Sequence, residues 1–288
     1  MVSSQSPPPF PPKPPRRFDK RLVLLLPLLG MGAVLAWKLI SQPPSSRVDR
    51  SIVPEGGRFG NQPRSAAPIA VPPPRIPVTD LATAQEPLPI QPPLIFSDVP
   101  PEHWARAVLD DLSARGLLTG FPEGTFEPEQ PMLRAELSAQ IARIFALPAQ
   151  AAKAQFVDVE PDHWAAASIR RAVQMGFLTG LPEGRFGPEQ TVTKAEVLVA
   201  IANGLSLTTT AHPETVLQRY RDRADIPAWA VSGLVATTQA GLVINYPNVE
   251  QLEPNRAITR AEAAAILHQA LVYLGQINEI PSPYRVAP

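Results

Sequence analysis

Between residues 96 and 277, apolar positions recur at helical spacing in short stretches that proline- and glycine-rich loops separate. In the first stretch four apolar residues share one helical face: Trp104, Val108, Leu109 and Leu112. The pattern predicts a helix that begins near Pro101, since proline is favoured in the first turn. Gly116 follows the apolar stripe and is the expected C-terminal cap of this helix.

The same pattern returns twice. The segment FSDVPPEHWA at residue 96 is repeated as FVDVEPDHWA at 156 and, with more changes, as YRDRADIPAWA at 220. The tryptophans show an interval of 60 and then 65 residues: Trp104, Trp164 and Trp229. One unit of about 50 residues buries too little surface to be stable alone. We therefore expect the three units to pack on one another and to share a core.

Each unit carries a second predicted helix after its loop, which in the first unit is FPEGTFEP and must turn. The apolar positions of the first such helix are Leu137, Ile141, Ile144 and Phe145. In the later units Thr193 stands three residues before Glu196, and Thr259 three before Glu262, which is the capping-box pattern of a helix start. Leu133 occupies the cap position in the first unit, so that helix start is less well specified.

Charge and composition exclude several classes of protein. The 288 residues include 26 basic and 26 acidic ones, whereas a nucleic-acid-binding protein normally carries a basic stripe. The chain has no cysteine, so it forms neither disulfides nor a thiolate metal site. Its four histidines are scattered without metal-binding spacing. We expect no nucleic-acid partner, no metal and no cofactor.

The N-terminal part differs from the repeats. A basic, proline-rich flank precedes a run of sixteen uncharged residues that begins at Leu22. If Lys38 extends its ammonium to the interface, residues 22–40 reach the roughly 20 apolar residues that a membrane helix needs. A cleaved secretory signal with its site near Ala36 is an alternative, and a buried core helix is disfavoured because no folded neighbour could cover it. We favour the uncleaved anchor, with its basic flank in the cytoplasm.

A disordered linker is predicted between this segment and the repeats. Of the 37 prolines, 21 lie in the first 95 residues, and no apolar period persists there. Such a segment cannot bury enough surface to offset its ordering entropy. The predicted organisation is a basic tail 1–21, a transmembrane helix or signal anchor 22–40, a linker 41–95, repeats 96–147, 156–207 and 220–275, the last degenerate, and a C-terminal tail 276–288.

The repeated motifs resemble one known family. The pattern F-x-D-V…HWA, followed by (L/F)LTG-x-PEG-x-F-x-P and then (R/K)-A-E, is similar to the S-layer homology domain, which usually occurs in three tandem copies. The resemblance covers residues 96 to about 275, and the third copy departs from it at Arg223, Ala224, Asn245 and Leu252. It implies a mostly α fold of three helix-loop-helix repeats, packed as a pseudo-threefold, three-pronged spindle. It also implies non-covalent binding of peptidoglycan-linked polysaccharide.

Three basic residues are the first candidates for that binding. One opens each second helix: Arg134, Lys194 and Arg260. Wall polymers often carry carboxylate, ketal-linked acid or phosphate groups, for which a fixed cation is a natural partner. The N–H groups and the dipole at a helix start also favour an anion. We predict that these cations bind polymer acids, with the lysine less selective than an arginine. A solvated flank paired with a nearby acid is the alternative.

Further candidates lie in the loops and before the first helices. Loop glycines would let the backbone approach a sugar closely: Gly120, Gly124, Gly180 and Gly184. The tryptophans Trp104, Trp164 and Trp229 could stack on sugars, although we favour a place in the core, or partly in it, for them. An aspartate precedes each first helix and could bond a sugar hydroxyl, although helix capping is favoured: Asp98, Asp158 and Asp222.

Together these features predict a non-catalytic anchor of the cell envelope. Residues 22–40 would hold one end in a membrane while the repeats bind peptidoglycan-linked wall polysaccharide, which would tether the wall to that membrane. The N-terminus would be cytoplasmic and the repeats would be exported to the periplasm or wall. The alternative is a scaffold whose repeats bind envelope proteins. Neither a Ser-His-Asp set, nor paired carboxylates, nor a phosphate loop stands out in the sequence, so we do not expect an enzyme.

Overall fold

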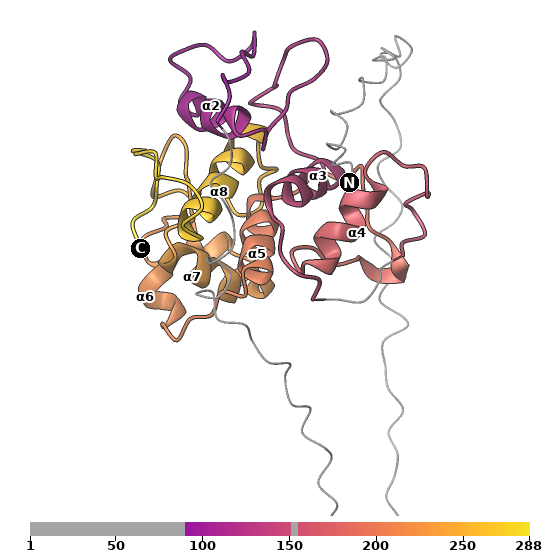
Figure 1. Cartoon of the computed structure of the whole chain (residues 1–288). Coiled ribbons are helices and arrows are strands. Elements are labelled where there is room, and N and C mark those ends of the chain that lie inside the picture. Colours follow the sequence, from indigo (N-terminus) through magenta and orange to yellow (C-terminus); the bar gives the residue numbers. More distant parts are fainter. Residues whose placement is uncertain (1–89, 151–154) are drawn as a thin grey trace, which may run out of the picture. The chain divides into compact units, whose positions relative to one another are not determined.

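The computed structural model describes residues 90–150 and 155–288, and the predicted membrane segment and nearly all of the predicted linker lie outside these ranges. Within them the chain is mostly α-helical and has no extended strand (Figure 1). Among the residues described, no helix has the length and apolar character needed to cross a membrane.

Each repeat contributes a first and a second helix, as the sequence predicts. The first helices are α2 (Arg106–Ala114), α4 (Ala166–Gln174) and α7 (Val231–Gln239). The second helices are α3 (Arg134–Ile144), α5 (Lys194–Gly204) and α8 (Arg260–Tyr273). Shorter elements are the helix α6 (Pro213–Leu217) and the 3-10 turns η1 (Pro182–Gly184), η2 (Arg223–Asp225) and η3 (Ala228–Ala230).

The predicted start of the first helix is wrong, and its predicted end is correct. Helix α2 begins at Arg106 rather than near Pro101, because the intervening residues form tight turns in which the Arg106 N–H donates to the His103 carbonyl at 2.9 Å. Gly116 has a φ of 68°, and its N–H donates to the Ser113 carbonyl at 2.9 Å. This left-handed conformation ends a helix and suits glycine, which has no Cβ.

Helices pair between repeats. Each second helix packs against the first helix of the following repeat: α3 against α4, α5 against α7, and α8 against α2 (Figure 1). The last of these pairs joins the third repeat back to the first. No repeat therefore completes its own helix pair, which explains why units of this size fold together.

A ring of backbone hydrogen bonds also joins the three repeats. The N–H of Met132 donates to the carbonyl of Ile258 at 3.0 Å, and that of Ile258 to the carbonyl of Val192 at 2.9 Å. The N–H of Val192 closes the ring on the Met132 carbonyl at 3.0 Å. These residues lie just before the three second helices, so the ring fixes the helix starts relative to one another.

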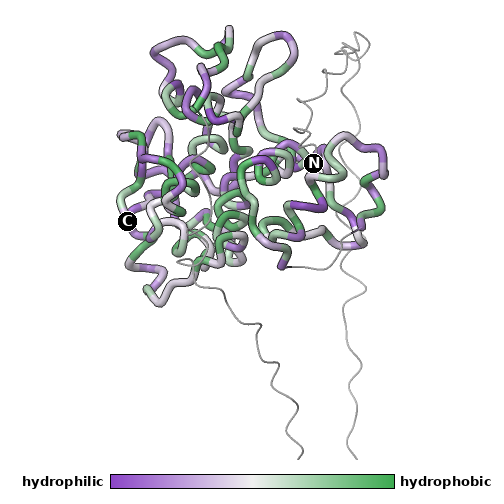
Figure 2. The backbone as a smooth tube through the Cα atoms, viewed as in Figure 1, coloured by the Kyte–Doolittle hydropathy of each residue, from purple (hydrophilic) through white to green (hydrophobic). Residues whose placement is uncertain are grey.

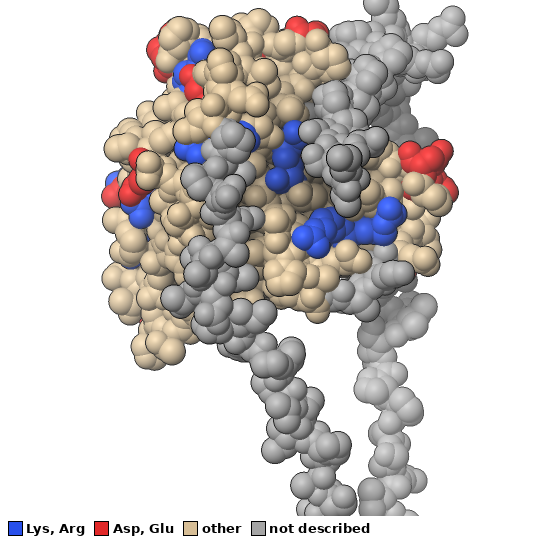
Figure 3. Space-filling view, viewed as in Figure 1, with Lys and Arg blue, Asp and Glu red and all other residues tan. Residues whose placement is uncertain are grey.

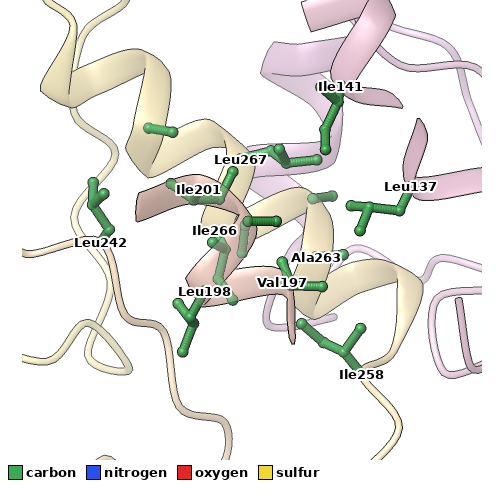
Figure 4. Packing of buried hydrophobic residues seen from close by; sticks show 14 of the residues in the cluster. Leu137, Ile141, Val197, Leu198, Ile201, Leu242, Ile258, Ala263, Ile266 and Leu267 are labelled. Carbon is green, nitrogen blue, oxygen red and sulfur yellow. The ribbon is translucent and has the colours of Figure 1, made fainter. Parts of the chain in front are cut away.

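The core lies where the second helices meet. Helix α8 is buried around nearly its whole circumference from Arg260 to Leu271, as expected of a central helix. Figure 4 shows Leu137 of α3, Ile201 of α5 and Leu267 of α8 in this core. In Figure 2 hydrophobic positions gather on these inner helices. Of the predicted apolar positions of the first two helices, Trp104 lies outside α2 and is only partly buried. The others are buried: Val108, Leu109, Leu112, Leu137, Ile141, Ile144 and Phe145.

Candidate functional site

The aspartates before the first helices hold the loops instead of capping the helices. Asp158 accepts the N–H of Phe186 at 2.7 Å and that of Gly187 at 2.8 Å. Asp98 and Asp222 make the same pair of bonds in repeats 1 and 3. The capping prediction is therefore wrong, since α2, α4 and α7 have no side-chain cap. Burial alone would raise the pKa of Asp158, but the two loop N–H bonds, its own backbone N–H and the charge of Arg185 together hold the pKa below its usual value.

The loop glycines have internal reasons to be glycine. Gly124 and Gly184 have φ values of 83° and 69°, in the left-handed region that glycine adopts without strain. Gly120 and Gly180 lie against the phenylalanine that opens their repeat, and a Cβ on Gly180 would come 2.6 Å from the Phe156 ring. A close approach of sugar to these loops stays a prediction.

The N–H groups at the starts of the second helices are already bonded. Those of Arg134 and Ala135 donate to the carbonyls of Gln190 at 2.9 Å and Pro188 at 3.0 Å. Equivalent bonds link the start of α5 to residues 254 and 256, and that of α8 to residues 128 and 130. The expectation that these N–H groups help to bind an anion is therefore wrong, because they join one repeat to the next.

Lys194 faces a carboxylate inside the protein. Its side chain is 1% exposed, and its ammonium lies 3.3 Å from Oε1 of Glu262 in the third repeat. Arg256 holds the same oxygen at 2.6 Å. Burial lowers the pKa of Lys194, and the attraction of Glu262 only partly reverses this.

Arg260 is enclosed by the first repeat. Its side chain is 1% exposed, its Nε donates to the Phe126 carbonyl at 2.8 Å, and its Nη1 donates to Glu136 at 2.9 Å. The ring of Phe121 lies 4.7 Å from the guanidinium carbon and covers it. Both Lys194 and Arg260 thus fit the alternative in which the cation pairs with a nearby acid, although both are buried rather than solvated.

Arg134 is held in the same way but borders an open groove. Its Nε donates to the Phe186 carbonyl at 2.9 Å and its Nη2 to the Thr179 carbonyl at 3.0 Å. Among the residues described, none accepts a hydrogen bond from Nη1. Burial lowers the pKa of Arg134, and the charge of Glu196 partly restores it; an arginine remains charged at neutral pH.

This groove has a volume of about 280 Å³ and is built by all three repeats. Repeat 1 supplies Arg134 and repeat 3 supplies Trp229, while the other lining residues come from repeat 2: Phe177, Leu178, Thr179, Leu181, Glu196, Val199, Ala200 and Asn203. We call it the Arg134 groove. A larger cavity of about 480 Å³ beside Phe156 and α4 contains none of the predicted site residues.

Two of the three tryptophans are more exposed than expected, whereas Trp104 packs partly buried against the core, as predicted. Trp229 is 59% exposed and Trp164 is 38% exposed, so the prediction that they lie in the core is wrong. Trp104 is partly buried and stacks on Tyr246, with ring centroids 4.8 Å apart. Trp229 is therefore the tryptophan that stands open beside a fixed cation.

Charge is dispersed on the face of the molecule that Figure 3 shows. On the face shown in Figure 3, Lys and Arg side chains form separate small groups among uncharged residues. In residues 90–150 and 155–288 no group of three His, Asp or Glu side chains could hold a metal ion. Binding to an acidic polymer would therefore depend on single, well-placed cations.

Sequence reasoning missed the repeat 2 residues of the groove. Glu196 and Asn203 lie on α5 and face Arg134 across the boundary between repeats. The signal for Glu196 was present, because the motif (R/K)-A-E places a glutamate at the third position of each second helix. In this fold each of those glutamates faces the cation of the preceding repeat.

The structure defines a class of protein: tandem helical repeats that interlock in a closed order and form grooves at their boundaries. Residues 95–138, 155–198 and 219–264 each match the S-layer homology domain, so the chain carries three S-layer homology domains.

Several known proteins share this region. An amylopullulanase from Thermoanaerobacterium thermosulfurigenes is 28% identical over 184 residues, which cover 63% of this chain and 10% of that protein. A cellulosome-anchoring protein from Acetivibrio thermocellus is 28% identical over 159 residues, or 54% and 35% of the two chains. An S-layer protein from Bacillus thuringiensis subsp. finitimus is 26% identical over 173 residues, or 60% and 21%. The match thus covers 35% or less of each of these relatives.

Proposed function

We propose that this chain is a non-catalytic anchor of the cell envelope that binds peptidoglycan-linked wall polysaccharide in the Arg134 groove. Three S-layer homology domains support the proposal, as do relatives named as S-layer and cellulosome-anchoring proteins. The observation that carries it is the meeting, in one groove, of a fixed guanidinium and an indole that is 59% exposed.

The two side chains suit two parts of a wall sugar. Nη1 of Arg134 can donate a charge-assisted hydrogen bond to a carboxylate, a ketal-linked acid or a phosphate. The indole face of Trp229 offers an apolar surface to the C–H groups of a sugar ring, and its N–H offers a donor. Glu196 holds the guanidinium by charge and opposes a second acidic group in the same groove. The groove thus favours one acid per bound sugar unit.

One groove, rather than three equal ones, is proposed to carry most of the affinity. Lys194 and Arg260 are buried and paired inside the protein. A ligand acid could reach them only by displacing Glu262 or Phe121. The prediction that all three cations bind polymer acids is thereby narrowed to a leading role for Arg134.

The remaining features complete the proposed anchor. The apolar run and its basic flank support a membrane anchor at residues 22–40, with the N-terminus cytoplasmic and the repeats exported to the periplasm or wall. The closed order of the hydrogen bonds between repeats supports the pseudo-threefold, three-pronged arrangement that the family resemblance implies. The absence of a recognisable catalytic motif in the sequence supports a binding role without catalysis.

The test is co-sedimentation of the full chain with wall sacculi, of which half are stripped of attached polymer by acid. Trp229→Ala should weaken binding about tenfold or more, as expected for loss of a central aromatic contact. Trp164→Ala is the matched control, since that exposed tryptophan holds the equivalent position in the second repeat and does not line the Arg134 groove. Arg134→Gln should also lose binding.

Three results would change the proposal. Binding that survives stripping would move the ligand to peptidoglycan itself. Equal binding by the Trp229 and Trp164 variants would exclude the Arg134 groove. No binding of the unaltered chain to either sample would favour the protein scaffold, which capture of envelope proteins could then test.

A further inference from the structure

Residues 276–288 return across the third repeat and pair with it. Ile244 and Arg285 form an antiparallel bridge. Two hydrogen bonds of 2.9 Å flank it: Asn245 N–H to the Tyr284 carbonyl, and Val286 N–H to the Val243 carbonyl. The side chain of Val286 is buried in the core cluster. The segment is therefore a bound strand-like element of this domain.

The surface beneath this segment is equivalent to the Arg134 groove. In the repeat register, residues 243–246 correspond to residues 178–181, which form one wall of that groove. Lys194 corresponds to Arg134, and Trp104 corresponds to Trp229. Lys194 itself is enclosed with Glu262, so we give the name Trp104 groove to the surface formed by Trp104 and residues 243–246.

The returning segment touches both walls of the Trp104 groove. Its backbone bonds to one wall at residues 243 and 245. The ring of Tyr284 lies edge-on to Trp104, with centroids 5.9 Å apart, and edge-on to Tyr246 at 4.9 Å. An aromatic side chain of the protein thus covers the indole whose counterpart, Trp229, is open.

The segment satisfies the groove incompletely. Nε1 of Trp104 is buried and has no hydrogen-bond acceptor among the residues described. A buried donor without an acceptor is unfavourable relative to one that is bonded. A sugar oxygen in place of Tyr284 would supply that acceptor, so a ligand has an interaction to gain that the segment does not provide.

We propose that residues 276–288 occupy the Trp104 groove as an internal substitute for ligand, and that their removal gives the chain a second site for wall polysaccharide. This inference rests on the proposed function of the Arg134 groove. While the segment is bound, only the Arg134 groove of the two is open to ligand. Release of the segment opens the Trp104 groove as well.

The test uses polymer-bearing sacculi and the full chain with Arg134→Gln, which removes binding in the Arg134 groove. Ending that chain after Gln276 should restore the binding lost through Arg134→Gln. Adding Trp104→Phe, which removes the buried Nε1–H donor, should abolish the restored binding, which separates the Trp104 groove from non-specific adhesion of the uncovered surface. Near-UV circular dichroism checks folding. Tyr284→Ser with Val286→Ser replaces the truncation if the shorter chain does not fold.

A folded, opened variant that still fails to bind would overturn the inference, as would restored binding that Trp104→Phe leaves intact. If the unaltered chain does not bind sacculi, the proposed function fails and deuterium exchange without ligand decides the inference. Exchange at the Asn245 amide that is equally fast in the full and shortened chains would then show that the segment does not cover the groove.

Discussion

The buried pair of Lys194 and Glu262 predicts an asymmetry in stability. The two side chains are 1% and 3% exposed and lie 3.3 Å apart. Glu262 also accepts hydrogen bonds from Arg256 at 2.6 Å and from the Thr259 N–H at 3.0 Å. Among the residues described, the ammonium has only Glu262 as a hydrogen-bond partner. Removing the lysine therefore leaves the carboxylate with other hydrogen-bond partners, whereas removing the carboxylate leaves the buried ammonium with none in the described part of the chain.

The magnitudes follow from this difference. Burying an ammonium costs several kcal/mol, which its ion pair only partly offsets, and burial accordingly lowers the pKa of Lys194. Lys194→Met replaces the ammonium with an apolar side chain of similar length and should change the free energy of unfolding by no more than about 1 kcal/mol. Glu262→Gln leaves the buried ammonium beside a neutral partner and should lower the free energy of unfolding by about 3 kcal/mol. For a domain of this size that loss lowers Tm by about 6–12 °C.

Thermal and urea unfolding of the unaltered chain, the two single variants and the double variant measure the effect. The double variant, Lys194→Met with Glu262→Gln, should recover the part of the loss that comes from the unpaired ammonium, because both changes act on that ion pair. The part that comes from the bonds of Glu262 to Arg256 and to the Thr259 N–H should remain. Glu250→Gln is the control, since the exposed pair of Glu250 and Arg221 should contribute only about 0–1 kcal/mol. A loss of more than about 2 kcal/mol in Lys194→Met, or additive losses in the double variant, would refute the reasoning.

Three further changes have definite outcomes. Asp158→Asn should cost about 1–3 kcal/mol and speed amide exchange at Phe186, because a neutral amide cannot accept both loop N–H groups; unchanged exchange would contradict the loop-holding role. Gly180→Ala should cost about 1–3 kcal/mol in urea unfolding, because the added Cβ meets the Phe156 ring; a neutral result would mean that the ring moves aside. The folded-state pKa values of Asp158 and Glu262 are lowered. The stabilisation from these carboxylates is therefore present above the usual carboxyl range and is lost as pH falls through the folded-state values. Tm should drop on acidification, and the drop should be smaller in Asp158→Asn.

Local signals predicted the helices well. The apolar stripes of α2 and α3, the glycine cap at Gly116 and the capping boxes at Thr193 and Thr259 depend on residues within a few positions of one another. The start of α2 was placed too early because proline in a first turn and proline in a tight turn give the same local pattern. In the structure the turn around His103 takes up those residues.

Contacts between distant segments were beyond the sequence. The N–H groups that Asp98 accepts lie 28 and 29 residues along the chain, so its position before a helix suggested a cap. The partners of Lys194 and Arg260 belong to other repeats, and the shared (R/K)-A-E motif gave no sign that Arg134 would border an open groove while Lys194 and Arg260 are enclosed. The three sites differ in their neighbours. Phe121 covers Arg260 and Tyr284 lies against Trp104, whereas neither residue lies at the Arg134 groove.

The ring of bonds through Met132, Val192 and Ile258 has a mechanical consequence. In a linear array of repeats each unit contacts only its sequence neighbours, so the ends can fray one unit at a time. Here the third repeat is bonded to the first, and the array has no free end from which to peel. A pulling force applied at residue 90 must break contacts to both other repeats before the first unit yields. Under tension between two attachments, the domain should resist as one body and fail in a single step.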